Sequence, residues 1–508
     1  MTKDGNNGVK HEHPPLEEAF FETAPETDQG ALVGAPQAVW RAVRRAIPVV
    51  LVVLAVLAVA LVLYAGPVPA THADTPVLVD AARARGAELG RDLGIPSPGP
   101  LYAAVGTYPV TPDPPNYVRL AGYGPAVRKS LGLDGEVTSF AWLMRAGAGP
   151  TCAIMGADLL LVTPDLAESV ATEVNALARI PREHILFTAS HSHSSLGGYG
   201  RTPAEGWLLG AAETVLEFLS MRWAPTAWGA SRELRPAVIR AGQPQAPSLI
   251  YNRLDKQGTE DATLDVLQLD VNGNEPALLV FYGAHPTSES RRDWLSPDYP
   301  GFLRKTVSEH VGAFVSFGAG PMGSMGVHSP TGERTPGVVG KLLATPVMGA
   351  FRPRSINEPV SPSEARVACG RAELPLPPLR VPVVGSWALT ERASELLLTP
   401  PPAFHVSALV VGPALVVSVP GELSGEVTLP LRERARKKGY SLVVASFSGE
   451  YAGYLLPAER YGKGVEGPLQ LAGVGAAAPT VAFIEGLVDA LPQGPVPADA
   501  PVEKVWPQ

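Results

Sequence analysis

An uncharged apolar run from Ile47 to Ala65 constrains this chain more than any other feature of its sequence. At a rise of about 1.5 Å per residue, a helix over this run nearly spans the apolar core of a bilayer. Arg41, Arg44 and Arg45 lie directly before it. Because basic residues beside a span favour the cytoplasmic side, the run predicts a single-pass signal anchor in the cell membrane. The remainder of the chain is then expected outside the cytoplasm, in the periplasm or the extracellular space.

The segment before this run, residues 1–37, is polar, acidic in patches and without apolar periodicity. This composition predicts a disordered cytoplasmic leader. A cleaved signal peptide is the alternative, because Ala70-Thr-His-Ala73 resembles a cleavage site, but the long leader and the long apolar run favour a retained anchor over residues 47–65. A buried core helix is a third interpretation, and the basic flank argues against it.

The chain of 508 residues exceeds the usual size of one domain, so one large domain with insertions or two domains are expected. Only 18% of residues are charged, and 53 prolines with 52 glycines indicate many turns. We predict an α/β fold with mixed β-sheets flanked by helices, in one large loop-rich domain over residues 74–491. Residues 353–402 are rich in proline and poorly periodic, which predicts a long surface excursion. Residues 492–508 are expected to form a proline-rich tail.

Charge and cysteine content narrow the classes of function. A net charge of −8 and the lack of a glycine-rich phosphate loop predict no binding of nucleic acid or nucleotide. Cys152 and Cys369 are the only cysteines, which excludes a disulfide scaffold and a four-cysteine zinc site. One long-range disulfide and two buried thiols are equally compatible with the sequence.

Two histidines follow a short apolar run, Ile185 to Ala189, where a buried strand is expected to end in a loop. In extended backbone, residues two apart point to the same face, so His191 and His193 could reach one metal ion. Such pairs also occur as surface hydrogen-bonding groups. More ligands are therefore required before a metal site is indicated.

Two further apolar runs end in a residue that can bind a metal, namely His285 and Glu422. A catalytic zinc site commonly takes three protein ligands of these types. Each residue has a plainer interpretation: a loop histidine before a proline, a carboxylate at a helix amino end, and, for Tyr454, simple packing. Asp158, which also follows an apolar strand, could support the ligands.

The order of these motifs resembles that of the neutral (neutral/alkaline, non-lysosomal) ceramidases over roughly residues 101–478. The resemblance is carried by the following segments: His191-Ser-His193-Ser-Ser-Leu-Gly-Gly, Asn252-Arg253, Ala284-His285-Pro-Thr-Ser, Asp298-Tyr-Pro-Gly, Val419-Pro-Gly-Glu422 and Tyr451-Ala-Gly-Tyr454. It covers the catalytic region of that family. Members are zinc-dependent amidohydrolases that cleave the N-acyl amide of ceramide into a long-chain base and a fatty acid.

The resemblance implies a role for seven residues of this chain. It implies that Zn²⁺ is bound by four of them: His191, His285, Glu422 and Tyr454. His193 and Arg253 would orient or polarise the amide of a lipid substrate, and Ser324 would take the place of the family's catalytic serine. The implied enzyme is a membrane-anchored zinc amide hydrolase.

Two segments depart from the family pattern. After Tyr461, where the family usually has a tyrosine-glutamate pair, this chain has Val465-Glu466. Where the family has Gly-Asp-x-Ser-Pro, this chain has Gly320-Pro-Met-Gly-Ser324, with proline in place of the aspartate and the serine one position late. A hydrolase of another lipid amide or of an ester is compatible with this change, and so is a catalytically impaired member that binds lipid or a partner. A serine esterase using Ser194 or Ser324 with a histidine base is a further alternative.

Overall fold

The computed structural model describes residues 35–124, 128–464 and 467–496, so most of the predicted leader and of the predicted tail lies outside the described residues. The chain divides into two compact units, Met1–Leu63 and Tyr64–Gln508. Helix α1 runs over Ala35–Ala65. Its window Val43–Ala60 has a mean hydropathy of 2.3 and is not buried. By length and composition, α1 can therefore cross a membrane, as the apolar run predicts.

Two mixed β-sheets form the centre of the second unit, as predicted. The larger sheet has, in spatial order, β12 (Phe314–Ala319), β10 (Ala277–Tyr282), β9 (Asp265–Val271), β7 (Arg235–Gly242), β2 (Gly99–Pro109), β4 (Thr138–Ala146), β5 (Cys152–Ala157) and β6 (Ile185–Ala189), with β14 (Glu364–Ala365) beside β2. The smaller sheet has β15 (Val367–Leu374), β18 (Phe404–Val411), β19 (Ala414–Val419) and β21 (Ser441–Ser446).

Shorter strands and further helices surround these sheets. The short pairings are β1 (Val68–Pro69) with β17 (Trp387–Ala388) and β16 (Pro382–Val384), β3 (Gly132–Leu133) with β11 (Trp294–Leu295), β8 (Ile250–Asn252) with β13 (Met325–Val327), and β20 (Glu422–Leu423) with β22 (Tyr454–Leu455). The helices after α1 are α2 (Thr75–Gly94), α3 (Pro164–Ala178), α4 (Pro203–Leu209), α5 (Glu213–Ser231), α6 (Asp298–Val311), α7 (Pro336–Ala350), α8 (Glu391–Leu398), α9 (Thr428–Lys437) and α10 (Ala477–Ala490).

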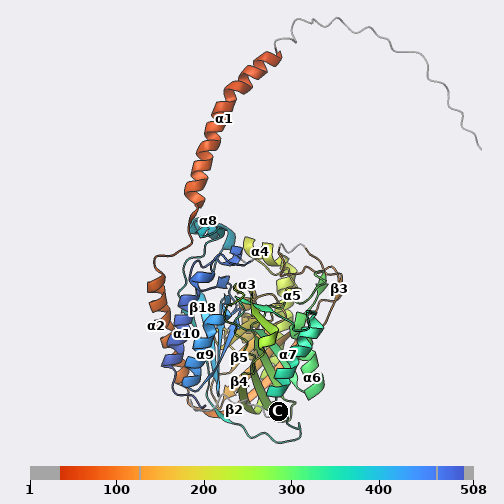
Figure 1. Ribbon diagram of the computed structural model, residues 1–508. Helices are drawn as coiled ribbons and strands as arrows, with labels where there is room; N and C mark the ends of the chain where they lie inside the picture. The colour runs from red at the N-terminus through yellow and green to blue at the C-terminus, as the bar shows by residue number, and fades with distance from the viewer. Residues whose placement is uncertain (1–34, 125–127, 465–466, 497–508) are drawn as a thin grey trace, which may run out of the picture. The chain divides into compact units, whose positions relative to one another are not determined.

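The two sheets pack face to face between layers of helices. Alternate residues of one strand point to opposite faces, so Trp142 of β4 joins the core between the sheets while Leu143 faces the helices. Helices α3, α5, α6 and α7 cover the outer face of the larger sheet, and α2, α9 and α10 cover that of the smaller sheet (Figure 1). The strands are therefore buried on both faces, which explains their continuous apolar runs.

The larger sheet curls until its two edge strands, β12 and β6, touch. Across this contact a Cβ on Gly318 would lie 3.0 Å from Thr188, and Trp142 donates a hydrogen bond to Ser316 at 3.1 Å. The right-handed twist between neighbouring strands accumulates over the whole sheet. As a result, the loops that follow β6 and β10 meet, although these strands are far apart in the order of the sheet.

Local patterns predicted several connections, and one prediction was wrong. Strands β5 and β6 are parallel and joined through α3, as expected for the strand-helix-strand unit, and β9 and β10 form the hairpin expected at Asn272-Gly273. Residues 353–402 are not a structureless excursion, because β15 in this segment is an edge strand of the smaller sheet. Its Gly370, Arg371 and Glu373 interrupt the apolar pattern. An edge strand with a half-exposed face lacks the continuous apolar run of a central strand.

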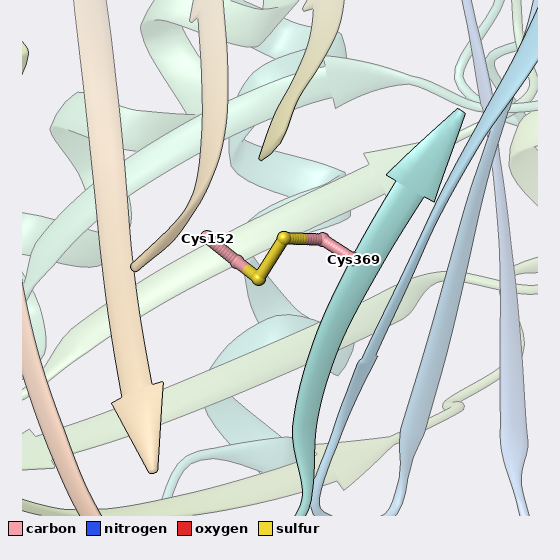
Figure 2. Close-up of a disulfide and its surroundings, with 2 residues drawn as sticks. All are labelled: Cys152 and Cys369. Carbon is pink, nitrogen blue, oxygen red and sulfur yellow. A yellow bond between two sulfur atoms is a disulfide. The ribbon is translucent and has the colours of Figure 1, made fainter. Parts of the chain in front are cut away.

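A disulfide joins the two sheets. Cys152 at the start of β5 is bonded to Cys369 of β15, with the Cα atoms 5.9 Å apart and 217 positions of separation in sequence. Figure 2 shows the bond between the two strands. The sequence left a disulfide and free thiols open, and the structure has the disulfide. Such bonds persist in oxidising compartments.

Candidate metal centre and active site

The candidate site lies where the loops after β6 and β10 meet β20 and β22. His191 and His193 follow β6, and His285 follows β10. Glu422 begins β20 and pairs in register with Tyr454 of β22. Arg253 directly follows β8, so five separate segments supply the side chains.

His191 departs from the extended backbone expected of a strand end. Its φ is +64°, in the left-handed region, where residues with a Cβ are uncommon. The backbone N–H of His191 donates to Leu159 at 2.9 Å, which holds this conformation. The ring stacks on Phe447, with centroids 4.6 Å apart. The two histidines still converge, with ring centroids 4.7 Å apart, but a turn brings them together rather than a strand face.

Three imidazoles gather around the carboxylate of Glu422. Metal-binding atoms of three histidines, His191, His193 and His285, all lie within 4.8 Å of one another. Glu422 Oε2 lies 3.0 Å from His285 Nε2 and 3.7 Å from His191 Nε2. The nitrogens His193 Nε2 and His191 Nε2 are 3.2 Å apart. Tyr454 Oη is 3.3 Å from His285 Nε2.

The tautomers of two imidazoles indicate that a cation fits among these atoms. The Nδ1 of His191 donates to the carbonyl of Leu160 at 2.6 Å, and the Nδ1 of His285 donates to that of Met325 at 2.9 Å. Because a carbonyl can only accept, each neutral ring carries its proton on Nδ1 and presents a lone pair from Nε2. Glu422 Oε2 is buried and has no hydrogen-bond partner among the described residues. Unprotonated nitrogen and oxygen donors therefore face one another, as metal ligands do.

Electrostatics keep these groups in their metal-binding forms at neutral pH. Burial lowers the pKa of His191 to about 4, although Glu422 opposes the change. Burial likewise lowers the pKa of His193 and His285. Burial alone would raise the pKa of Glu422, but His191, His285 and Arg253 together hold it well below its ordinary value. Neutral imidazoles and an ionised carboxylate are the forms that bind a divalent cation.

Arg253 and Tyr451 hold the ligand side chains in place. Arg253 Nη2 donates to His285 Nε2 at 3.0 Å and to Tyr454 Oη at 3.1 Å. A cation bound by His285 and Tyr454 would take the place of this Arg253 N–H group. Tyr451 Oη donates to Glu422 Oε1 at 2.8 Å, which leaves Oε2 directed at the histidines. Tyr451 belongs to the Tyr451-Ala-Gly-Tyr454 motif, but no role was predicted for it from the sequence. Its position three residues before the candidate ligand Tyr454 could have indicated that it lies near the site.

Ser324 lies apart from the imidazoles. Its hydroxyl donates to the carboxylate of Glu426 and accepts from the backbone N–H of Gly425 at 3.0 Å. Its carbonyl accepts from the backbone N–H of Arg253 at 2.9 Å. Gly323 packs so closely that a Cβ there would lie 2.4 Å from the carbonyl oxygen of Glu422. The segment Gly320–Gly326, which differs from the family pattern, thus packs against the backbone of both Arg253 and Glu422.

Ser194, the other candidate nucleophile, is buried, and its hydroxyl has no hydrogen-bond partner among the described residues. Asp158 pairs with Arg304 of α6 at 2.6 Å. Its carboxylate therefore connects the end of β5 to this helix. Its hydrogen bonds are made with Thr138 and Arg304, and neither is a candidate ligand.

A cavity of about 1030 Å³ opens onto the imidazole cluster, and we call it the site cavity. His191, His193, Arg253, Glu422 and Tyr454 line it, whereas His285 and Ser324 are not among its lining residues. Its other walls include both apolar and polar side chains: Tyr123, Leu160, Leu161, Trp207, Leu208 and Arg292. The structure therefore brings six of the seven predicted residues together, whereas Ser324 is hydrogen-bonded to Glu426 and Gly425 and does not line the cavity.

Fold and site together define a mixed α/β protein with a cluster of side chains that could hold a metal ion, next to a cavity. A crystal structure of neutral ceramidase from Pseudomonas aeruginosa matches it with a TM-score of 0.64, over 79% of this chain and 76% of that one, at 17% identity. A structure of ceramidase complexed with C2 matches with a TM-score of 0.62, over 78% and 76%, at 16% identity. No family model and no curated protein matches the sequence. The chain has the fold of the neutral ceramidases, which confirms the predicted resemblance at the level of the fold.

Proposed function

We propose that this protein is a membrane-anchored zinc amidohydrolase that cleaves the N-acyl amide of ceramide or a related lipid. The observation that carries the proposal is the convergence of His191, His285 and Glu422, with unprotonated donor atoms facing one another beneath a cavity. The fold shared with neutral ceramidases supports the same class of reaction.

Four residues would hold the zinc: His191, His285, Glu422 and Tyr454. When bound, zinc supplies a Lewis acid that polarises a carbonyl and makes water a stronger acid. The reaction breaks the C–N bond of the amide, the acyl carbon gains the hydroxyl of water, and the nitrogen gains the proton. A fatty acid and a long-chain base are the products.

His193 and Arg253 would act on the substrate amide. The burial-lowered pKa of His193 keeps its ring neutral at pH 7, so one ring nitrogen can accept a proton. Arg253 carries a fixed positive charge at the cavity floor and can donate to an oxygen on which negative charge develops. Ser324 would hold the loop that positions Arg253 and Glu422 rather than contact the substrate.

The anchor and the disulfide support a location outside the cytoplasm. Helix α1 is long and apolar enough to span a bilayer, and its arginines precede the uncharged run that begins at Ile47. A disulfide between the two sheets is expected of an exported protein. The anchored enzyme would then meet its lipid substrate at the outer face of the cell membrane.

The test is metal analysis and hydrolysis on the same purified full-length protein. We expect about one zinc per chain, acid release from N-acyl sphingosines, loss of both in His191→Ala, and loss of activity on chelation that added zinc restores. Zinc-loaded protein that releases no acid from a panel of lipid amides would contradict the proposal. Full activity after chelation would favour a serine esterase instead.

A further inference from the structure

A set of exposed apolar side chains lies next to the end of α1, and we call it the anchor-side patch. It consists of Val383, Val384, Trp387, Leu396 and Leu397. They come from β16, β17 and α8. Val384 is 70% exposed and Leu396 is 65% exposed, which is far above what a core residue shows. Several exposed apolar residues on neighbouring elements commonly mark an interaction surface.

Hydrogen bonds from Thr390 connect the elements of this patch to Tyr64 and Ala65, the last residues of α1. Thr390, between β17 and α8, donates its N–H to the carbonyl of Ala65 at 2.8 Å and its hydroxyl to that of Tyr64 at 2.6 Å. Strand β1, which follows α1 directly, pairs with β17 of the patch. Tyr64 and Ala65 lie in the same compact unit as the patch and end the apolar helix. If α1 spans a bilayer, the chain itself therefore brings the patch to the bilayer surface.

A second cavity has wall residues in common with both the patch and the site cavity. Its volume is about 730 Å³, and Leu397 of the patch lines it together with Leu379, Val381 and Leu398. It shares five wall residues with the site cavity: Leu161, Trp207, Leu208, Tyr451 and Leu469. Tyr451 in turn donates to Glu422. The second cavity, whose walls are mainly apolar, is thus adjacent both to the exposed patch and to the site cavity.

We infer that the anchor-side patch sits in the surface of the bilayer that holds α1, and that lipid chains pass from the leaflet through the second cavity to the site. Tryptophan and aliphatic side chains together favour the boundary between headgroups and acyl chains. This inference rests on the proposed function, and in particular on α1 spanning the membrane. It adds the surface that contacts lipid and the route that an acyl chain takes.

A fluorescent label tests the position of the patch in the full-length protein reconstituted into phosphatidylcholine vesicles. The only two cysteines are bonded to each other, so Leu396→Cys can be labelled selectively with an environment-sensitive dye. The matched control is Ile95→Cys, an exposed apolar residue that precedes β2 at the end of the sheet away from the His191 loop. We expect blue-shifted emission that spin-labelled lipid quenches at position 396, and neither effect at position 95.

Two results would overturn this position of the patch. One is no quenching at position 396 in vesicles that flotation shows to contain the protein. The other is a blue shift that spin-labelled lipid does not quench, because this result would place a second copy or another protein on the patch. Both measurements are independent of activity, so they remain decisive even if the protein hydrolyses no amide.

A kinetic comparison tests the route. For Leu396→Glu, the rate on long-chain N-acyl sphingosine in bilayers, relative to a short-chain analogue in detergent micelles, should fall by about tenfold or more, because a charged group disfavours insertion. Ile95→Glu should keep the ratio within about twofold of wild type, since surface substitutions away from a binding feature have small effects. An unchanged ratio in Leu396→Glu would overturn the route. Wild-type protein that hydrolyses neither substrate would instead contradict the proposed function.

Discussion

Glu422 is the residue on which the candidate site depends most, because among the described residues it is the carboxylate that lies against two of the imidazoles. Its sequence context, an apolar strand followed by Pro-Gly-Glu, predicted a ligand but not the direction of each oxygen. That direction comes from Tyr451, which binds Oε1 and leaves Oε2 free to face His191 and His285. A hydrogen bond between residues far apart in sequence leaves no local pattern to find.

Replacing the carboxylate tests the ligand set. Glu422→Gln removes the negative charge and offers an amide in its place, so we expect zinc content well below one per chain and a loss of hydrolysis on the order of 100-fold or more. Metal analysis and acid release on the same preparation measure both. A variant with full zinc content and full activity would remove Glu422 from the ligand set.

Tyr451→Phe tests the positioning of Glu422. Without the phenol donor, the carboxylate loses the hydrogen bond that orients it, so zinc affinity should fall about tenfold. Competition with a chromogenic chelator measures the affinity, and circular dichroism serves as the control for folding. Unchanged affinity would show that the pairing of β20 with β22 orients Glu422 without this hydrogen bond.

Ser324→Ala separates a positioning role from a catalytic one. The buried hydroxyl binds Glu426 and the amide of Gly425, so its loss should lower the free energy of unfolding by about 1–3 kcal/mol. The turnover number per folded molecule should stay within about threefold of wild type, because the residue does not line the site cavity. A loss of several orders of magnitude with unchanged stability would restore the catalytic role predicted from the family pattern.

At the level of secondary structure elements, the ends of β6 and β10 and the segment β20 carry the site, and each could be recognised in the sequence as an apolar run followed by a ligand residue. The sequence did not predict that these three segments lie close together. It requires the larger sheet to curl until β12 touches β6, and this curl depends on twist summed over the whole sheet. Edge strand β15 was also missed, because polar residues and a glycine interrupt its pattern.

The bond between β5 and β15 gives a prediction at this scale. In Cys152→Ala/Cys369→Ala, the unfolded chain regains the freedom of a loop closed over 217 positions, so the free energy of unfolding should fall by about 5 kcal/mol. Denaturant unfolding of oxidised wild type, reduced wild type and the double variant measures this difference. Reduced wild type should match the variant. Equal stability of all three would show that sheet packing alone holds the two layers.

At the scale of the whole molecule, the chain is a helix able to span a membrane followed by one large mixed α/β unit. Composition and hydropathy predicted this organisation, because a long uncharged apolar run differs plainly from the proline-rich and glycine-rich remainder. The anchor-side patch had no such signal. Its residues are scattered among polar ones, and only the folded arrangement gathers them beside Tyr64 and Ala65.

His72, just before α2, makes the stability of this unit depend on pH. Burial, and next the charge of Arg380, lower the pKa of His72 to about 4, whereas in the unfolded chain it is near 6.5. Between these values the unfolded chain binds the proton first, so the stabilising contribution is complete above pH 6.5 and is lost as the pH falls toward 4. In His72→Gln, the loss of unfolding free energy between pH 7 and pH 5 should be smaller than in wild type. Denaturant unfolding of the detergent-solubilised full chain at both values measures this, and equal slopes would contradict it.

The long separation of Cys152 and Cys369 in sequence also determines when, during biosynthesis, their disulfide can form. Both cysteines must have left the ribosome and met an oxidant before the bond can form, and a reducing cytosol would keep them as thiols. If the chain is exported as proposed, the bond that joins its two sheets can form only after translocation. A recombinant host that exports the protein through its own membrane should yield the mature form, whereas cytosolic production should yield a dithiol precursor.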